Sequence, residues 1–317
     1  MNKRPQDFTR VQQLEISDQQ DGQRLDNFLL KTLKPLPKSR VYRIIRKGEV
    51  RVNKKRCKPE YKLQVGDIVR IPPVTLDEPE NREAHIPQRW LDELERSILF
   101  ENHSIIVINK PSGLAVHSGS GLAYGVIDIM RKLRHQNDME LVHRLDRDTS
   151  GCLILAKSRS GLLEMQSLLK SDEIAKYYTA LVYDHWDKSC RQVEIPLNKT
   201  TLSNGERRVF ADPAGKSALT LIEKIENQMI GEKRLSRLTI RLKTGRTHQI
   251  RVHCQSEGHP IIGDDKYGDR ERDKVMRRAG LKRLMLHAFR LEIPANAHTK
   301  AMQIIAPLPQ VFEIKEK

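Results

Sequence analysis

The sequence is poor in cysteine, in aromatic residues and in long apolar runs. Its 317 residues include four cysteines, which are Cys57, Cys152, Cys190 and Cys254. They lie far apart and form no C-x-x-C pair, so their spacing argues against a disulfide framework. His248 and His253 are five residues apart, but no further pair of cysteines or histidines completes a set of four zinc ligands. We therefore expect no metal site.

No apolar run reaches the 18 residues that a membrane-spanning helix needs. The residues that follow Met1 are polar and do not form the core of a signal peptide. We therefore expect a cytoplasmic protein without a membrane partner. Hydrophobic residues make up 38% of the chain and aromatic residues 5%, against 31% charged residues. This composition predicts a modest aliphatic core under a heavily charged surface.

Acidic residues are scarce in one part of the chain. The whole chain has 57 Lys and Arg residues against 41 Asp and Glu residues, a net charge of +16. Residues 22–72 hold 15 Lys and Arg residues but 4 Asp and Glu residues, a net charge of +11. A basic surface that serves only solubility would spread its charge more evenly. The clustering therefore indicates a segment that binds a polyanion such as nucleic acid.

Residues 22–72 also have the pattern of a small folded unit. Residues 24–33 place apolar side chains on one helical face. Ser39 is expected to cap a second helix, which stops at Gly48. A strand is predicted at residues 50–53, and a basic turn follows it. The expected RNA-binding residues lie on the second helix and on this turn: Lys38, Arg40, Arg43, Arg46, Lys47, Lys54, Lys55 and Arg56.

The order of short motifs in this segment resembles that of an S4 domain. The motifs are RLD at 24–26, SRVYRIIRKG at 39–48, VRVN at 50–53 and VGD at 65–67. The resemblance implies a module that binds structured RNA but names no reaction, because S4 domains occur in many proteins. Repeated prolines and an excess of acidic residues predict a linker after it. We expect a polar tail at residues 1–20, an S4-like domain at 21–75, the linker at 76–97 and a catalytic domain at 98–317.

The stretch HRLDRDTSG at residues 143–151 carries the candidate catalytic group. Asp146 stands between two arginines, just before the apolar run CLILA at residues 152–156, which has the length of a buried strand. A carboxylate at the mouth of a buried strand is placed for chemistry rather than for solvation. Asp146 is therefore the candidate nucleophile, with Asp148 as its rival. His143 of the same motif is interpreted as structural.

Two further segments carry candidate site residues. TGRTHQIRVH at residues 244–253 follows a predicted strand, and Thr247 is expected to cap a helix that carries Arg251. Tyr177 and Tyr178 stand near the start of another predicted strand. Because side chains alternate along a strand, we expect the two tyrosines to point to opposite faces.

Together these segments resemble the pseudouridine synthases that act on large-subunit ribosomal RNA. Five motifs occur in the family's order: KPSG at 110–113, HRLDRDTSG at 143–151, KYYTALV at 176–182, GRTHQIRVH at 245–253 and LHA at 286–288. The S4-like segment, with KPEYKL at 58–63, is most similar to one bacterial subtype of these enzymes. The resemblance implies an α+β fold, in which the S4-like domain is followed by a mixed, largely antiparallel β-sheet with flanking helices and a central cleft.

The resemblance also implies a reaction. Specific uridines of 23S ribosomal RNA, in naked RNA or in a partly assembled large subunit, would be isomerised to pseudouridine by a monomeric enzyme. The N1–C1′ bond breaks, the base turns and a C5–C1′ bond forms, which requires neither a cofactor nor a metal. Asp146 would add to ribose C1′ or assist a glycal route, and both routes stay open.

The family pattern further implies roles for four neighbours of Asp146. Arg251 would form a bidentate ion pair with Asp146 and keep it ionised. Tyr178 would stack on the detached uracil, and Ile250 would pack beneath the base. Arg144 would fill the space that the flipped uridine leaves. Each residue has a plainer alternative, which is a phosphate contact for the two arginines and core packing for Tyr178 and Ile250.

Other functions fit parts of the sequence less well. An S4-domain protein that binds RNA with a silent catalytic fold would lack Asp146 or Arg251, and both are present. A methyltransferase would show a Gly-rich loop after its first strand, and none occurs. A hydrolytic glycosidase would need two carboxylates with distinct roles, and Asp146 and Asp148 are too close in sequence to assign them. The silent RNA-binding protein remains the alternative to the synthase.

Overall fold

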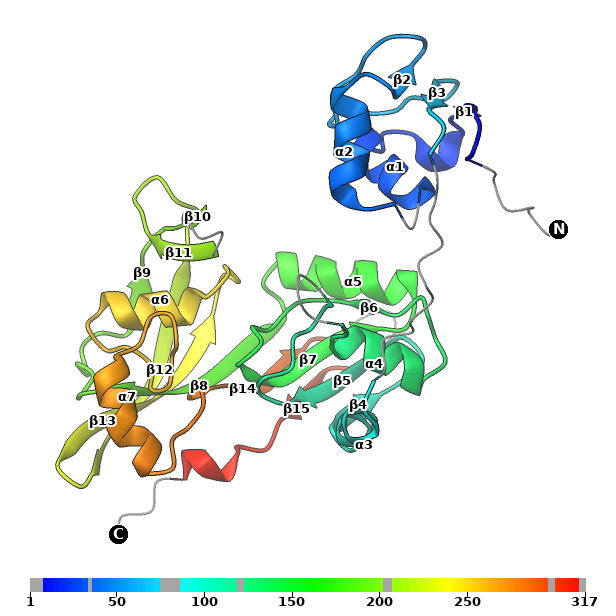
Figure 1. Ribbon diagram of the computed structural model, residues 1–317. Helices are drawn as coiled ribbons and strands as arrows, with labels where there is room; N and C mark the ends of the chain where they lie inside the picture. The colour runs from blue at the N-terminus through cyan, green and yellow to red at the C-terminus, as the bar shows by residue number, and fades with distance from the viewer. Residues whose placement is uncertain are drawn as a thin grey trace. The chain divides into compact units, whose positions relative to one another are not determined.

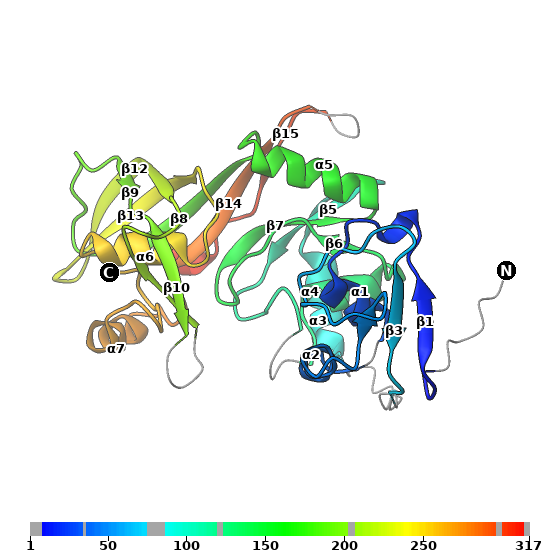
Figure 2. The same cartoon turned by 90° about the horizontal axis from the view of Figure 1, so that it is seen from above.

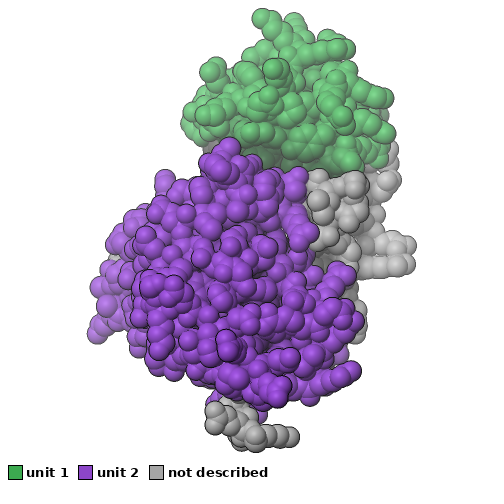
Figure 3. All heavy atoms as spheres, turned by 90° about the vertical axis from the view of Figure 1, so that its left-hand side faces the viewer, with its two compact units in different colours: residues 1–83 green, residues 84–317 purple. Residues whose placement is uncertain are grey.

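The computed structural model describes residues 8–33, 36–74, 86–118, 123–201, 207–295 and 300–313. The chain divides into two compact units, residues 1–83 and residues 84–317 (Figure 3). Within the described residues, no helix is long and apolar enough to cross a membrane.

The N-terminal unit packs two helices against a small antiparallel sheet with strand order β1-β3-β2 (Figure 1). Its elements are β1 (Gln12–Glu15), η1 (Asp18–Gln20), α1 (Leu25–Thr32), α2 (Lys38–Arg46), β2 (Arg51–Val52) and β3 (Ile68–Ile71). Leu29 of α1 and Val41 of α2 are fully buried in one cluster with Val69 of β3. The apolar positions that predicted the two helices therefore form the core of this unit.

Two expectations for this unit were wrong. Strand β1 lies inside the predicted N-terminal tail, pairs with β3 and is followed by the buried Ile16. A single edge strand that buries only alternate side chains is too short to stand out in a polar segment. The second helix begins at Lys38 rather than after a Ser39 cap, because Pro37 occupies the N-cap position.

The second unit contains a ten-stranded sheet with the order β4-β5-β7-β14-β8-β13-β12-β9, to which β15 and β6 are added on β14 and β7. The strands are β4 (Ile98–Glu101), β5 (Ile105–Lys110), β6 (Glu140–Leu141), β7 (Ser150–Ala156), β8 (Ala175–Tyr183), β9 (Gln192–Glu194), β12 (Leu219–Ile230), β13 (Lys233–Leu242), β14 (Leu286–Ile293) and β15 (Met302–Ile305). Strand β10 (Leu197–Thr201) and strand β11 (Arg207–Ala211) form a separate hairpin. Of the pairs in the large sheet, β7 with β14 is parallel and the others are antiparallel. The predicted mixed, largely antiparallel sheet is confirmed.

Helices cover both ends of this sheet (Figures 1 and 2). They are α3 (Gln88–Arg96), α4 (Val126–Leu133), α5 (Arg159–Lys170), α6 (Gln249–Ser256), α7 (Arg270–Arg278) and η2 (Gln310–Phe312). Ile105 of β5 packs in a cluster with Met165 of α5, whereas Ile106 faces the cluster that contains Ile129 of α4. Burial on both faces explains why residues 152–156 form a continuous apolar run instead of an alternating one.

The linker prediction was wrong for residues 86–97, and residues 75–85 lie outside the described part of the chain. Helix α3 occupies this stretch, with Leu94 fully buried and Trp90 packed against the main core. Its charged residues cover the outer face of an amphipathic helix. The acidic composition therefore reflects exposure of one helix face and not the absence of structure.

Gly151 occupies the point where β7 meets β14, and its backbone has φ +111°. A Cβ atom at this position would overlap the backbone of Ala288. Gly151→Ala should therefore destabilise the protein by about 2 kcal/mol or more, through backbone strain and overlap together. Gly113→Ala is the matched control, since Gly113 has φ +87° but open space around it. Equal losses in urea denaturation would contradict the steric part of this prediction.

Candidate active site

A pocket at the middle of the sheet brings four of the five predicted motifs together. We call it the central pocket. Its lining residues are Arg144, Leu145, Asp146, Thr149, Tyr178, Leu242, Gly245, Arg246, Thr247, His248, Gln249, Ile250, Arg251 and Leu286. Asp146 precedes β7, Tyr178 stands on β8, and Arg251 stands on the helix that follows β13. Because β14 alone separates β7 from β8, and β13 is next to β8, these three residues are neighbours in space.

The KPSG motif at residues 110–113 donates hydrogen bonds to loop 143–149, which joins β6 to β7. Lys110 is fully buried, and its ammonium group donates to the carbonyls of Pro111, Leu114 and Arg147 at 2.8, 2.8 and 2.9 Å. Ser112 Oγ donates to the carbonyl of Asp148 at 2.6 Å. Burial lowers the pKa of Lys110 to about 7. The motif thus supports loop 143–149 and does not line the central pocket.

The two carboxylates of the loop have different surroundings. The side chain of Asp146 is 17% exposed and lines the central pocket. The carboxylate of Asp148 instead contacts Arg147, with 3.2 Å between Nε and Oδ1. His143 accepts a hydrogen bond from the amide of Ile154 at 3.1 Å, and burial lowers its pKa to about 4. A half-buried imidazole that accepts from the backbone of β7 agrees with the structural interpretation of His143.

Arg251 is buried and makes its bidentate ion pair with Asp264, not with Asp146. Its Nε and Nη2 donate to the two Asp264 oxygens at 2.7 and 2.6 Å. Nη2 also contacts Asp265 at 3.2 Å. Only Nη1 faces Asp146, at 3.5 Å from Oδ2. The predicted fork between Arg251 and Asp146 was therefore wrong, although the ion pair between them is present. Burial opposes the charge of Arg251, but the hydrogen bonds to Asp264 and the charges of the nearby carboxylates together raise the pKa of the guanidinium.

The helix that carries Arg251 begins differently from the prediction. Helix α6 starts at Gln249, and its N-cap is His248, at φ 53°, instead of Thr247. The His248 ring points its Nε2 toward Asp146, 3.8 Å from Oδ1, and its Nδ1 toward the Tyr267 hydroxyl at 2.8 Å. Burial lowers the pKa of His248, and the Asp146 charge only partly offsets this effect.

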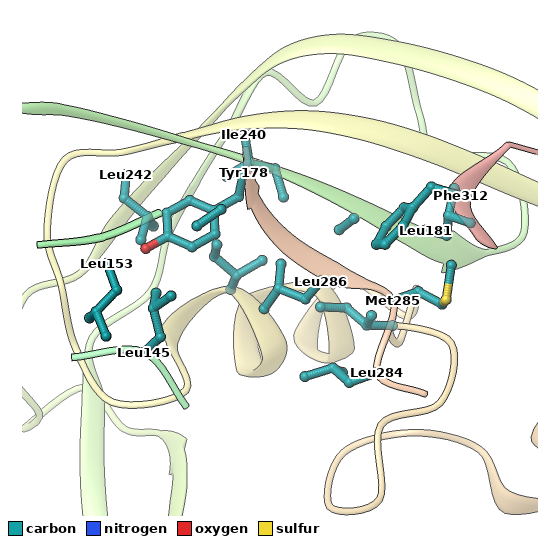
Figure 4. Close-up of a cluster of buried hydrophobic side chains, with 14 of the residues drawn as sticks. Leu145, Leu153, Tyr178, Leu181, Ile240, Leu242, Leu284, Met285, Leu286 and Phe312 are labelled. Atoms are coloured by element: carbon teal, nitrogen blue, oxygen red, sulfur yellow. The ribbon is translucent and has the colours of Figure 1, made fainter. Parts of the chain in front are cut away.

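Tyr178 and Ile250 form an apolar wall of the central pocket. Tyr178 is 7% exposed, and Figure 4 shows its ring among Leu145, Leu153 and Leu242. Burial raises the pKa of Tyr178, and the nearby Asp146 charge adds to this effect. Ile250 is buried in the same hydrophobic cluster and lines the same pocket.

Tyr177 lies where the sequence placed it. Tyr177 points to the other face of the sheet, where Arg290 stacks on its ring at 3.8 Å from the centroid. Arg144 is exposed at the rim of the central pocket. In the N-terminal unit, the predicted basic residues lie on the surface of α2 and on the turn after β2: Lys38, Arg40, Arg43, Arg46, Lys47, Lys54, Lys55 and Arg56.

The sequence analysis missed Asp264 and Tyr267. Both lie in GDDKYG at residues 263–268, directly after the buried pair Ile261 and Ile262. A carboxylate beside a buried apolar run is the signal that marked Asp146, so Asp264 carried a signal that was available. Nothing in the sequence, however, indicated that its partner would be Arg251.

The fold and the central pocket define an enzyme of RNA modification, and the chain belongs to the RNA pseudouridylate synthase family. The family's sequence profile matches residues 104–256, and that of the S4 domain matches residues 23–69. The chain is therefore an isomerase that acts on RNA. The human RNA Pseudouridylate Synthase Domain Containing 1 has a similar structure, with a TM-score of 0.55 and 26% identity over 67% of this chain and 83% of that one.

Bacterial relatives match almost the whole chain. The ribosomal large subunit pseudouridine synthase C of Pasteurella multocida is 50% identical over 96% of this chain and 93% of its own length. The protein of the same name from Haemophilus influenzae is 50% identical over 91% of this chain and 89% of its own length. The one from Vibrio cholerae is 48% identical over 96% of both chains. The predicted resemblance to one bacterial subtype is confirmed.

Replacing Asp264 should expose how much stability the buried ion pair carries. Asp264→Asn removes the charge that neutralises Arg251, and we expect a loss of about 3 kcal/mol in the free energy of unfolding. Asp265→Asn is the matched control, because its side chain is 60% exposed and such pairs contribute less than about 1 kcal/mol. Urea denaturation of both variants measures the difference. Similar losses in the two variants would show that Asp264 is not the main partner of Arg251.

Proposed function

We propose that this protein isomerises specific uridines of 23S ribosomal RNA to pseudouridine, with Asp146 as the nucleophile. The observation that carries the proposal is the Asp146 carboxylate in the central pocket, placed 3.5 Å from the Arg251 guanidinium and beside the buried Tyr178. The bacterial relatives named above are ribosomal large subunit pseudouridine synthases, and their similarity extends over both units. We infer a cytoplasmic, monomeric enzyme.

Asp146 is suited to act on ribose C1′. In the covalent route its carboxylate forms a bond to C1′ as the N1–C1′ bond breaks, and the detached uracil then turns to present C5. In the glycal route it removes a ribose C2′ proton instead, and the N1–C1′ bond breaks as the glycal double bond forms. In both routes C5 then attacks C1′, which breaks the Asp146–C1′ bond in the covalent route and is accompanied by return of the proton to C2′ in the glycal route. The C5 proton is then lost to water and N1 takes up a proton, so that the product is an isomer of the substrate. Arg251 Nη1 lies 3.5 Å from Asp146 Oδ2 and places a positive charge beside the carboxylate.

Tyr178 is assigned to hold the base by stacking. Its ring stands in the apolar wall of the central pocket with Leu242, Leu286 and Ile250. Because burial raises its pKa, the phenol keeps its proton at neutral pH and is a poor acceptor for the C5 proton. Stacking on uracil needs the ring face and not the ionised oxygen. Ile250 then packs beneath the base, as the family pattern implies.

Arg144 is assigned to the RNA outside the central pocket. A uridine must leave its stack to reach a buried carboxylate, and this flipping costs a few kcal/mol. Arg144 is exposed at the rim, so its guanidinium can stack in the space that the uridine leaves. The basic surface of the N-terminal unit supplies phosphate contacts, which position the RNA without reading its sequence.

Tritium release from C5 tests the chemistry. With 23S RNA labelled by tritium at uracil C5, the native protein should release tritium to water, and Asp146→Asn should release none above background. Asp148→Asn is the matched control, because it removes the neighbouring carboxylate and should keep activity. Release that persists in Asp146→Asn would contradict the assigned nucleophile. Binding without release by the native protein, on naked RNA and on assembling particles, would support the alternative of a silent S4-domain protein.

The salt dependence of binding tests the basic surface of α2. Replacing Lys38, Arg43 and Arg46 by Gln should lower the slope of log Kd against log salt by about 2 to 3, because each phosphate contact contributes about 0.7 to 0.9. The control is the replacement of three exposed lysines of the second unit, Lys188, Lys224 and Lys233, which makes the same change in charge. Equal slopes for the two variants would show that α2 does not contact phosphates.

A further inference from the structure

Asp146 is held at one oxygen by Arg251, which leaves its second oxygen to another group. Arg251 uses Nε and Nη2 for Asp264, so it offers only Nη1 to Asp146 Oδ2. A carboxylate with a single contact can still turn about its Cβ–Cγ bond. A nucleophile needs a fixed direction, because small misplacements of reacting atoms are costly in rate. The other oxygen, Oδ1, faces Nε2 of His248 at 3.8 Å.

The hydrogen bonds around Tyr267 favour the His248 tautomer that carries its proton on Nε2. The amide of Val209, on β11, donates to the Tyr267 hydroxyl oxygen at 3.0 Å. The hydroxyl proton is then free to be donated to His248 Nδ1, which lies 2.8 Å away. In a neutral imidazole, a nitrogen that accepts leaves the proton on the other nitrogen. Burial, which lowers the pKa of His248, favours this neutral form. In this tautomer, Nε2–H points at Asp146 Oδ1.

The same carboxylate that holds Arg251 also holds Tyr267. Oδ1 of Asp264 accepts hydrogen bonds from the amides of Lys266 and Tyr267 at 2.9 and 3.0 Å. The Arg251 guanidinium in turn lies over the Tyr267 ring, with 5.1 Å between its Cζ atom and the ring centroid. Asp264 thus fixes both groups that lead to Asp146. The backbone of His248 is itself constrained, since it is left-handed at the start of α6.

We propose that His248 is a positioning residue, which donates its Nε2–H to Asp146 Oδ1 and whose tautomer is set by the Tyr267 hydroxyl. The proposal rests on the function proposed for Asp146. The present separation of 3.8 Å is longer than a hydrogen bond, and catalytic hydrogen bonds commonly shorten when substrate binds. With Arg251 on one oxygen and His248 on the other, the carboxylate keeps one orientation toward C1′ throughout the reaction.

Two substitutions at His248 separate positioning from folding. The side-chain nitrogen of Gln reaches the place of Nε2 and donates there, whereas that of Asn is too short. Asn is the residue that better tolerates a left-handed backbone. A folding role would therefore make His248→Gln the poorer variant. Our proposal expects the reverse order, with His248→Asn lowering kcat for tritium release about 10- to 100-fold at nearly unchanged KM, and His248→Gln regaining most of it.

Tyr267→Phe tests the tautomer through a double-mutant cycle. Alone, it should lower kcat about 3- to 10-fold, because Nδ1 then loses its donor and either nitrogen can carry the proton. In the His248→Asn background the same change should leave kcat unaltered, since it acts through His248. Thermal unfolding of each variant shows the fraction folded at the assay temperature, so that kcat is expressed per folded molecule.

Each result decides the proposal. Equal kcat for the Asn and Gln variants, or an equal loss from Tyr267→Phe in both backgrounds, would overturn it. Asp146→Asn is run beside them in the same assay. If it retains activity, the function proposed for Asp146 fails, whatever His248 does. If it is inactive while all His248 variants match the native protein, the proposed function stands and the positioning role fails.

Discussion

The buried ion pair of Arg251 and Asp264 is the interaction on which the central pocket depends. Two hydrogen bonds shorter than 2.8 Å join these side chains, which are 4% and 0% exposed. Burying either charge alone would cost several kcal/mol, so each requires the other. The pair points Nη1 of Arg251 at Asp146, and the same aspartate holds the turn that carries Tyr267. A strong, buried contact thereby sets the direction of the weaker contacts around Asp146.

A second constraint acts on the loop that carries Asp146. Loop 143–149 makes no regular secondary structure of its own, so its carbonyl groups need donors from other segments. Lys110 and Ser112 supply them from the preceding strand and turn. Gly151 then allows β7 to approach β14, the strand that separates Asp146 from Tyr178 in the sheet. The buried ammonium group of Lys110 and the absence of a side chain at Gly151 thus together position the carboxylate of Asp146.

Much of the fold and of the site could be predicted from the sequence. The amphipathic helices of the N-terminal unit, the buried strand after Asp146 and the opposite directions of Tyr177 and Tyr178 follow from local periodicity, which depends only on backbone geometry. The errors have other causes. Strand β1 and helix α3 were missed because polar and acidic composition hid their narrow apolar faces. The caps at Ser39 and Thr247 were misplaced because helix ends depend on backbone angles that neighbouring residues fix.

The sequence by itself determined the chemistry that is available: the residue types, the charge clustered in residues 22–72 and the strand or helix on which each candidate side chain stands. Only the tertiary structure decided which partners they find. Arg251 could pair with any of several acidic residues. In the folded chain, its Nε and Nη2 bind Asp264, and only Nη1 faces Asp146. The physical reason is range. Periodicity acts over a few residues, whereas an ion pair requires a few ångströms between groups that lie far apart along the chain until the sheet and α6 pack together.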